Sequence, residues 1–165
     1  MKVTRVRAAL AICLVGGAAA ATVTYLTSTK TSAPFPVGKG VHPVMIAWAA
    51  GGNGARFHGS LGKVRIQGDS VQPEPFVDTF VASGTVGNQK FKAVCSGGLV
   101  DGHLSINVTG TLGTDALHGT AVLTLKSDDS RTLSFKGTVG STTISGTIPL
   151  PANTDSTIKG TVSVG

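Results

Sequence analysis

The stretch SFKGTVGSTTISG, residues 134–146, contains the pattern that decides the fold. Polar and apolar or small residues alternate on both sides of Gly140 and Ser141, as in a β-hairpin closed by a two-residue turn. With the turn placed there, Phe135 lies directly opposite Gly146. An aromatic ring over a strand glycine compensates for the poor strand propensity of glycine. The stretch therefore predicts a hairpin with a defined register.

Three related stretches precede this one along the chain. Their first glycines, Gly59, Gly84 and Gly110, are 25 and 26 residues apart, and Gly137 follows 27 residues later. The same register places large residues opposite small ones in all four units; the pairs are Phe57–Gly68, Gly59–Ile66, Gly84–Phe91, Val108–Gly119, Gly110–Leu117 and Gly137–Ile144, and Ala82 faces Ala93. Directly opposite side chains are close enough for such packing to set the register. The repeat predicts four hairpins that share one apolar face.

The other face of these strands is rich in Thr, Ser, Lys and His, as a solvent-exposed face should be. A last strand is predicted at Thr157–Val164, and a strand near Val44–Trp48 is a candidate neighbour for it. Glycine recurring on the apolar face suits a strongly coiled sheet. The predicted fold class is all-β: an antiparallel meander of repeated hairpins forming a small barrel or curved sandwich, preceded by an N-terminal hydrophobic helix. A transmembrane barrel is disfavoured, because it needs aromatic girdles that this sequence lacks.

Residues 1–26 have the layout of a targeting segment. Three basic residues precede the apolar run Ala8–Val15, and the small-residue tract Ala18–Ala21 offers a cleavage site, as in a secretory signal peptide. The alternative is an uncleaved membrane anchor, since residues 8–26 carry no charge and are just long enough to span a bilayer. Both interpretations place the folded part outside the cytoplasm, either secreted or tethered to the membrane through residues 8–26.

The rest of the chain divides into a linker and one domain. Residues 27–40 are rich in Ser, Thr, Pro and Gly and show no periodicity, which is typical of a linker or stalk. Residues 41–165 are predicted to form a single all-β domain, large enough for a hydrophobic core of its own.

The basic pI of 9.7 says little about partners. Of the 14 Lys and Arg residues, four lie in the first thirty positions, and the remainder balances to 10 − 8 = +2. The basic residues of the domain are dispersed rather than gathered in a stripe with aromatics, which argues against a nucleic-acid partner.

The titratable residues form no recognisable catalytic or metal-binding motif. His42, His58, His103 and His118 have no metal-ligand spacing, and the strand histidines are expected on the polar face. With Cys13 in the targeting segment, Cys95 is expected to be a buried core residue without a disulfide. No catalytic residue, metal or cofactor is predicted.

Weak candidates for ligand contact are Trp48, His58 and Asp101. Trp48 stands beside the Gly-rich stretch 51–54, where an isolated aromatic suits recognition. Two functions follow from these observations. The first is a non-catalytic binding or structural module of the cell envelope, whose partner is a glycan, a lipid or a protein. The second is a secreted barrel enzyme with a site built from loop residues such as His58, Asp78 and Asp101 at one end of the barrel.

Overall fold

The structure is a computed structural model, and it describes residues 33–51, 54–72, 79–100, 103–125, 131–150 and 157–165. In these ranges the chain forms strands and turns and no helix. No helix in this part of the chain is long and apolar enough to cross a membrane. The predicted N-terminal hydrophobic helix, residues 1–26, lies outside the described residues.

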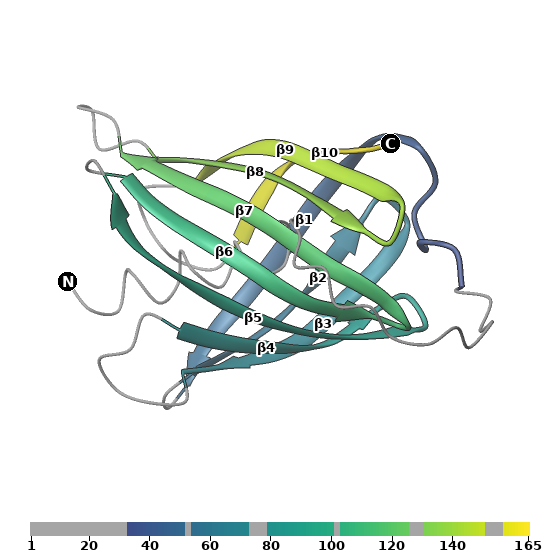
Figure 1. Cartoon of the computed structure of the whole chain (residues 1–165), viewed down its shortest axis with the longest axis horizontal. Coiled ribbons are helices and arrows are strands. Elements are labelled where there is room, and N and C mark those ends of the chain that lie inside the picture. Colours follow the sequence, from purple (N-terminus) through teal and green to yellow (C-terminus); the bar gives the residue numbers. More distant parts are fainter. Residues whose placement is uncertain (1–32, 52–53, 73–78, 101–102, 126–130, 151–156) are drawn as a thin grey trace, which may run out of the picture.

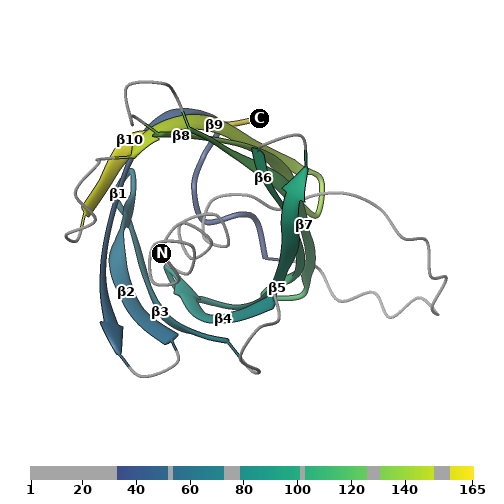
Figure 2. The same ribbon diagram turned by 90° about the vertical axis from the view of Figure 1, so that its left-hand side faces the viewer.

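Ten strands form one sheet, and each pairs antiparallel with the strand that follows it. They are β1 (Gly40–Gly51), β2 (Gly54–Leu61), β3 (Val64–Val71), β4 (Thr79–Val86), β5 (Gln89–Val100), β6 (His103–Leu112), β7 (Asp115–Leu125), β8 (Arg131–Val139), β9 (Thr142–Leu150) and β10 (Thr157–Val164). The last strand pairs with the first, with Ile46 opposite Ile158. The sheet therefore closes into a barrel rather than a sandwich (Figures 1 and 2).

The register predicted from the repeat is confirmed. Phe57 pairs with Gly68 and Phe135 with Gly146, and the other large-to-small pairs also lie opposite each other. In both aromatic pairs the ring lies over the glycine, with the phenyl Cζ 2.6 Å from the position that a glycine Cβ would occupy. Only a residue without a side chain fits under these rings. Each phenylalanine therefore requires a glycine at the position opposite it.

Tight turns join the strands at one end of the barrel, hereafter the tight-turn end. The four turns begin with Gly62, Gly87, Gly113 and Gly140, which have φ between 56° and 60°. Two-residue hairpin turns need such a left-handed conformation, and glycine adopts it without steric cost. The connections outside the described residues, 52–53, 73–78, 101–102, 126–130 and 151–156, all join strands at the opposite end, hereafter the loop end.

Inward-facing glycines allow neighbouring strands to approach closely. At Gly110 on β6, an added Cβ would lie 2.7 Å from the Cα of Ala93 on β5 and closer still to the Lys92 carbonyl oxygen. Gly59, Gly84 and Gly97 stand equally close to the backbone of a neighbouring strand. These contacts produce the strong coiling that the recurrence of glycine predicts.

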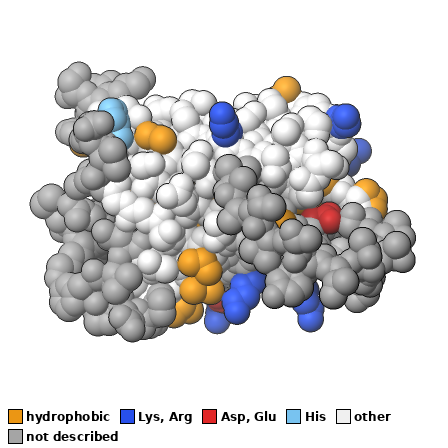
Figure 3. Space-filling model, in the orientation of Figure 1, with side chains coloured by type: hydrophobic (Ala, Val, Ile, Leu, Met, Phe, Trp, Pro, Cys, Tyr) orange, Lys and Arg blue, Asp and Glu red, His pale blue; other side chains and the backbone are white. Residues whose placement is uncertain are grey.

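The apolar face of the wall points into the barrel and the polar face points outward. Inward side chains such as Ile46, Phe57, Val108 and Leu133 are at most 1% exposed. Across the visible outer wall, uncharged polar side chains and backbone predominate, with scattered charges (Figure 3). A barrel that faces lipid has the reverse polarity, with an apolar outer band.

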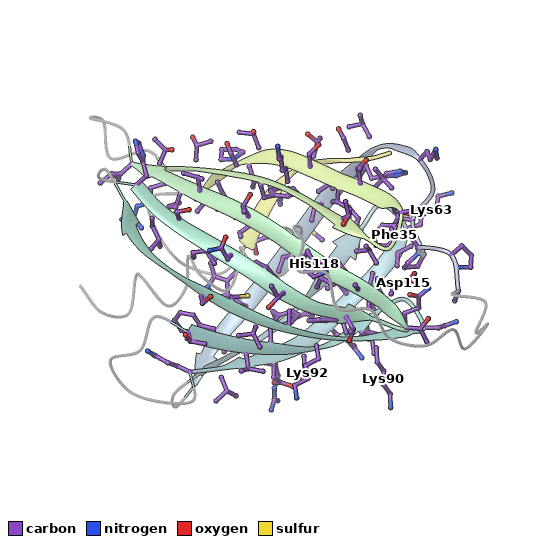
Figure 4. All side chains as sticks on the ribbon, viewed as in Figure 1. Phe35, Lys63, Lys90, Lys92, Asp115 and His118 are labelled. Atoms are coloured by element: carbon purple, nitrogen blue, oxygen red, sulfur yellow. The ribbon has the colours of Figure 1, made fainter. Side chains whose placement is uncertain are left out.

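Residues 33–39, which precede β1, pack across the tight-turn end. Val37 is buried and Phe35 packs against the core. The Gln89 side-chain amide donates a 2.7 Å hydrogen bond to the Pro34 carbonyl, and the His42 Nε2 is 2.7 Å from the carbonyl oxygen of Gly38. Phe35 lies at this end of the barrel in Figure 4, and in Figure 2 the segment crosses the far end of the ring of strands. The part of the predicted linker that the structure describes thus covers the base of the barrel.

Candidate functional site

The three candidate contact residues do not form one site. Trp48 on β1 shares the inward face with the buried Ile46 and is half-buried against the core. His58 on β2 is exposed on the outer face, one position beyond the Phe57 that pairs with Trp48. Side chains of successive strand residues point to opposite faces, so the barrel wall separates Trp48 from His58. Asp101 lies outside the described residues.

His58, His103 and His118 are on the outer face, as predicted, whereas His42 is at an inward position of β1. His103 is exposed, and His118 on β7 is half-buried between Thr109 and Thr138, with a buried Nδ1 that has no hydrogen-bond partner. Within the described ranges, no three His, Cys, Asp or Glu side chains come close enough to hold a metal ion. Asp78 and Asp101, on which a loop-borne enzyme site would depend, are in connections that the structure does not describe.

Cys95 on β5 is completely buried on the inner face, as its strand position predicts. The expectation that it forms no disulfide is wrong, because Cys95 is disulfide-bonded. Strand alternation predicts the face of the sheet to which a cysteine side chain points, but it does not predict whether that cysteine forms a disulfide. The other cysteine of the sequence, Cys13, lies outside the described residues.

One ion pair joins strands on the outer wall. The Arg56 Nε is 3.2 Å from the Asp69 Oδ1, and both side chains are largely exposed to solvent. Exposed pairs of this kind contribute between nothing and about 1 kcal/mol. With both side chains largely exposed, the pair has the geometry of a surface contact rather than of a reactive pair.

A shallow depression of about 440 Å³ lies on the outer face of β7, β8 and β9. Its lining residues are Thr120, Val122, Ser134, Phe135, Lys136, Ser145, Gly146 and Thr147. The hydroxyl groups of Ser134 and Thr147 share a 3.3 Å hydrogen bond across it. It is open, hydroxyl-rich and carries a single charged side chain, so it has little with which to select a ligand.

The inner surface of the barrel is the more promising site, because it is continuous, apolar and built from small residues. Glycine or alanine occupies many inward positions on every strand but β1: Ala55, Gly59, Gly68, Ala82, Gly84, Ala93, Gly97, Gly110, Gly119, Ala121, Gly137, Gly146 and Gly160. Larger aliphatic and aromatic side chains fill the positions between them. Ten strands about 4.8 Å apart and tilted by about 40° enclose a backbone cylinder of roughly 10 Å radius.

Two buried polar atoms on this surface have no hydrogen-bond partner. The Ser70 side chain on β3 is 2% exposed, and its Oγ has no hydrogen-bond partner. The Trp48 Nε1 is likewise buried without a partner. Among the described residues that face inward near the loop end, Trp48, Leu104, Leu123 and Leu150 are only partly buried and pack around the core. Ser70 is not among the residues predicted for a site; the signal in the sequence that identifies it is its strand parity with the inward-facing Ile66 and Gly68.

No protein-family model, no curated protein and no solved structure matches this chain.

Proposed function

We propose that this protein is an exported, non-catalytic binding module that holds an apolar ligand inside its barrel. The observation that supports this proposal is the polarity of the closed wall: its apolar face points inward and its polar face outward. An eight-stranded barrel is just wide enough for its own side chains to fill it or for one small ligand, and wider barrels enclose larger spaces. A wall of ten strands with glycine or alanine at many inward positions has the width and the small side chains that an enclosed apolar ligand would require.

Of the partners suggested by the sequence, a lipid fits this surface best. A glycan needs hydrogen-bonding groups, and the described inner face offers few of them. A protein partner would meet the outer wall, where the large exposed apolar residues Val41, Met45, Val71 and Val94 are spread over three strands. The export part of the proposal rests on the signal-peptide or anchor pattern of residues 1–26.

Trp48 allows a direct test, because it is the only tryptophan of the chain and faces inward. We expect an alkyl bromide to quench its fluorescence saturably when titrated into the full-length protein. Iodide should quench it weakly, because the indole packs against the core.

The matched variants place one large side chain inside or outside the wall. Ala82→Phe fills an inward position that is fully buried and should weaken the saturable quenching. Val94→Phe adds the same ring at an outward position that is 38% exposed and should leave the quenching unchanged. Circular dichroism establishes that both variants are folded. Quenching that rises linearly with alkyl bromide, with no saturation in the unmodified protein, would contradict the proposal.

A further inference from the structure

Ser70 lies in an environment that does not satisfy its hydroxyl group. It pairs with Ala55 on β2 and with Ala82 on β4, and all three side chains are buried. Neither alanine can accept or donate a hydrogen bond through its side chain. A buried polar group without a partner is destabilising, and native proteins retain few of them. An unpartnered hydroxyl on an apolar ligand surface points to a ligand group that pairs with it.

The Trp48 indole N–H is a second such group on the same part of the wall. Trp48 pairs with Phe57, and Ser70 pairs with Ala55, two residues further along β2 toward the loop end. The two side chains therefore lie on the strands that flank β2, in the half of the barrel nearer the loop end. The indole N–H can only donate a hydrogen bond, and the hydroxyl can donate or accept one. Each of them can therefore donate a hydrogen bond to a ligand oxygen.

The charge of the ligand oxygen follows from what surrounds these groups. The described inward positions of β1 to β5 carry no Lys or Arg, and the one histidine among them, His42, is bound to Gly38 at the tight-turn end. Arg131, the one Lys or Arg at an inward position of the described strands, is at the loop-end rim of β8, five strands away from Ser70. A carboxylate or phosphate placed beside Ser70 would be buried away from that charge, which is strongly unfavourable. The geometry therefore favours an uncharged oxygen, such as that of an alcohol or an ester.

The remaining length of the barrel suits an alkyl chain. Strands of 8 to 12 residues, tilted by about 40°, span roughly 20–30 Å along the axis. One lipid chain is roughly 15 Å long, half the hydrocarbon thickness of a bilayer. Because Phe35 and Val37 cover the tight-turn end, the chain would extend from Ser70 toward that base, with its polar end nearer the loop end.

We infer that the ligand is a single-chain lipid with an uncharged polar group, bound with its oxygen at Ser70 and Trp48 and its alkyl chain along the apolar inner wall. This inference rests on the proposed function and specifies its ligand. It assigns to Ser70 a role in ligand selection.

The test compares tetradecane, tetradecanol, methyl tetradecanoate and tetradecanoate as competitors of the alkyl bromide, with the full-length protein. We expect tetradecanol and the methyl ester to bind more tightly than tetradecane and tetradecanoate. Ser70→Ala should weaken tetradecanol binding about fivefold, the value of one neutral hydrogen bond, and leave tetradecane binding unchanged. It should also raise the melting temperature of the ligand-free protein, because it removes an unpartnered hydroxyl. The matched control is Ser83→Ala, which removes an exposed hydroxyl on the outer face of β4.

Trp48→Phe provides a second variant, measured by Nile red displacement because it lacks the tryptophan. It keeps an aromatic ring without the N–H and should also weaken tetradecanol binding about fivefold. Equal affinity for tetradecanol and tetradecane in the unmodified protein would overturn the inference, as would preferential binding of tetradecanoate. So would a tetradecanol-to-tetradecane ratio that Ser70→Ala leaves unchanged, which would mean that water pairs with the hydroxyl. Failure of all four compounds to bind would instead refute the proposed function.

Discussion

Replacing Gly110 with alanine tests whether close strand approach, rather than turn geometry, is what requires glycine inside the barrel. The added Cβ would lie 2.7 Å from the Cα of Ala93, whereas ordinary contacts of this kind begin near 3.4 Å, and the Lys92 carbonyl oxygen is nearer still. The obstacle is backbone of a paired strand, so no side chain can rotate away. The strands β5 and β6 must separate by several tenths of an ångström or more, in the middle of their hydrogen-bonded ladder.

Overpacking of this kind typically destabilises a protein by about 1–3 kcal/mol. For a domain of about 130 residues, each kcal/mol lowers the melting temperature by roughly 3–5 °C. Gly110→Ala should therefore melt roughly 3–15 °C below the unmodified protein, as measured by circular dichroism.

Gly98→Ala is the matched control, because Gly98 is on the neighbouring strand β5 and a Cβ there would meet no atom within 4 Å. Both substitutions restrict the unfolded chain equally, an effect that by itself stabilises by about 0.4–1 kcal/mol. The difference between the two variants thus isolates the contact in the folded barrel. If both variants melt within about 2 °C of each other, the close approach does not explain these glycines.

Three further predictions concern the core, the surface and the N-terminus. Phe135→Ala should cost about 3–5 kcal/mol in urea unfolding and Phe135→Leu distinctly less, because the ring is buried over Gly146; equal losses would show that ring coverage is unimportant. Arg56→Ala should change the free energy of unfolding by less than about 0.5 kcal/mol, since its ion pair with Asp69 is exposed; a loss above 2 kcal/mol would show that the pair is structural. Residues 1–26 fused to a phosphatase that is active only outside the cytoplasm should yield activity, and replacing the three basic residues at positions 2, 5 and 7 with glutamate should reduce it; inactive fusions would contradict export.

Strand register could be predicted from the sequence because it depends on side-chain sizes and residue spacing within a single hairpin. Phe135 and Gly146 are eleven residues apart, and one hairpin turn fixes which residue each one meets. The pairing of the Val44–Trp48 strand with Thr157–Val164 agrees with the prediction that the two strands are candidate neighbours.

Other features depend on contacts that no local pattern contains. Closure into a barrel rather than a curved sandwich depends on the accumulated coiling of ten strands. The packing of Phe35 and Val37 against the core could not be predicted, because the Pro- and Ser-rich composition around them is typical of a linker. The buried position of Ser70 could not be predicted from its residue type, because serine in an alternating strand usually faces solvent. Only its even spacing from the inward-facing Ile66 places it inside the barrel.

The pairing of β1 with β10 has a consequence for how the chain folds. Every other pairing joins strands adjacent in sequence, so most of the barrel can assemble through short-range contacts, which favour rapid folding. Ile46 and Ile158 are more than a hundred residues apart, and their meeting requires the closure of a very long loop. Until that step, β1 and β10 are open sheet edges that can pair with other chains.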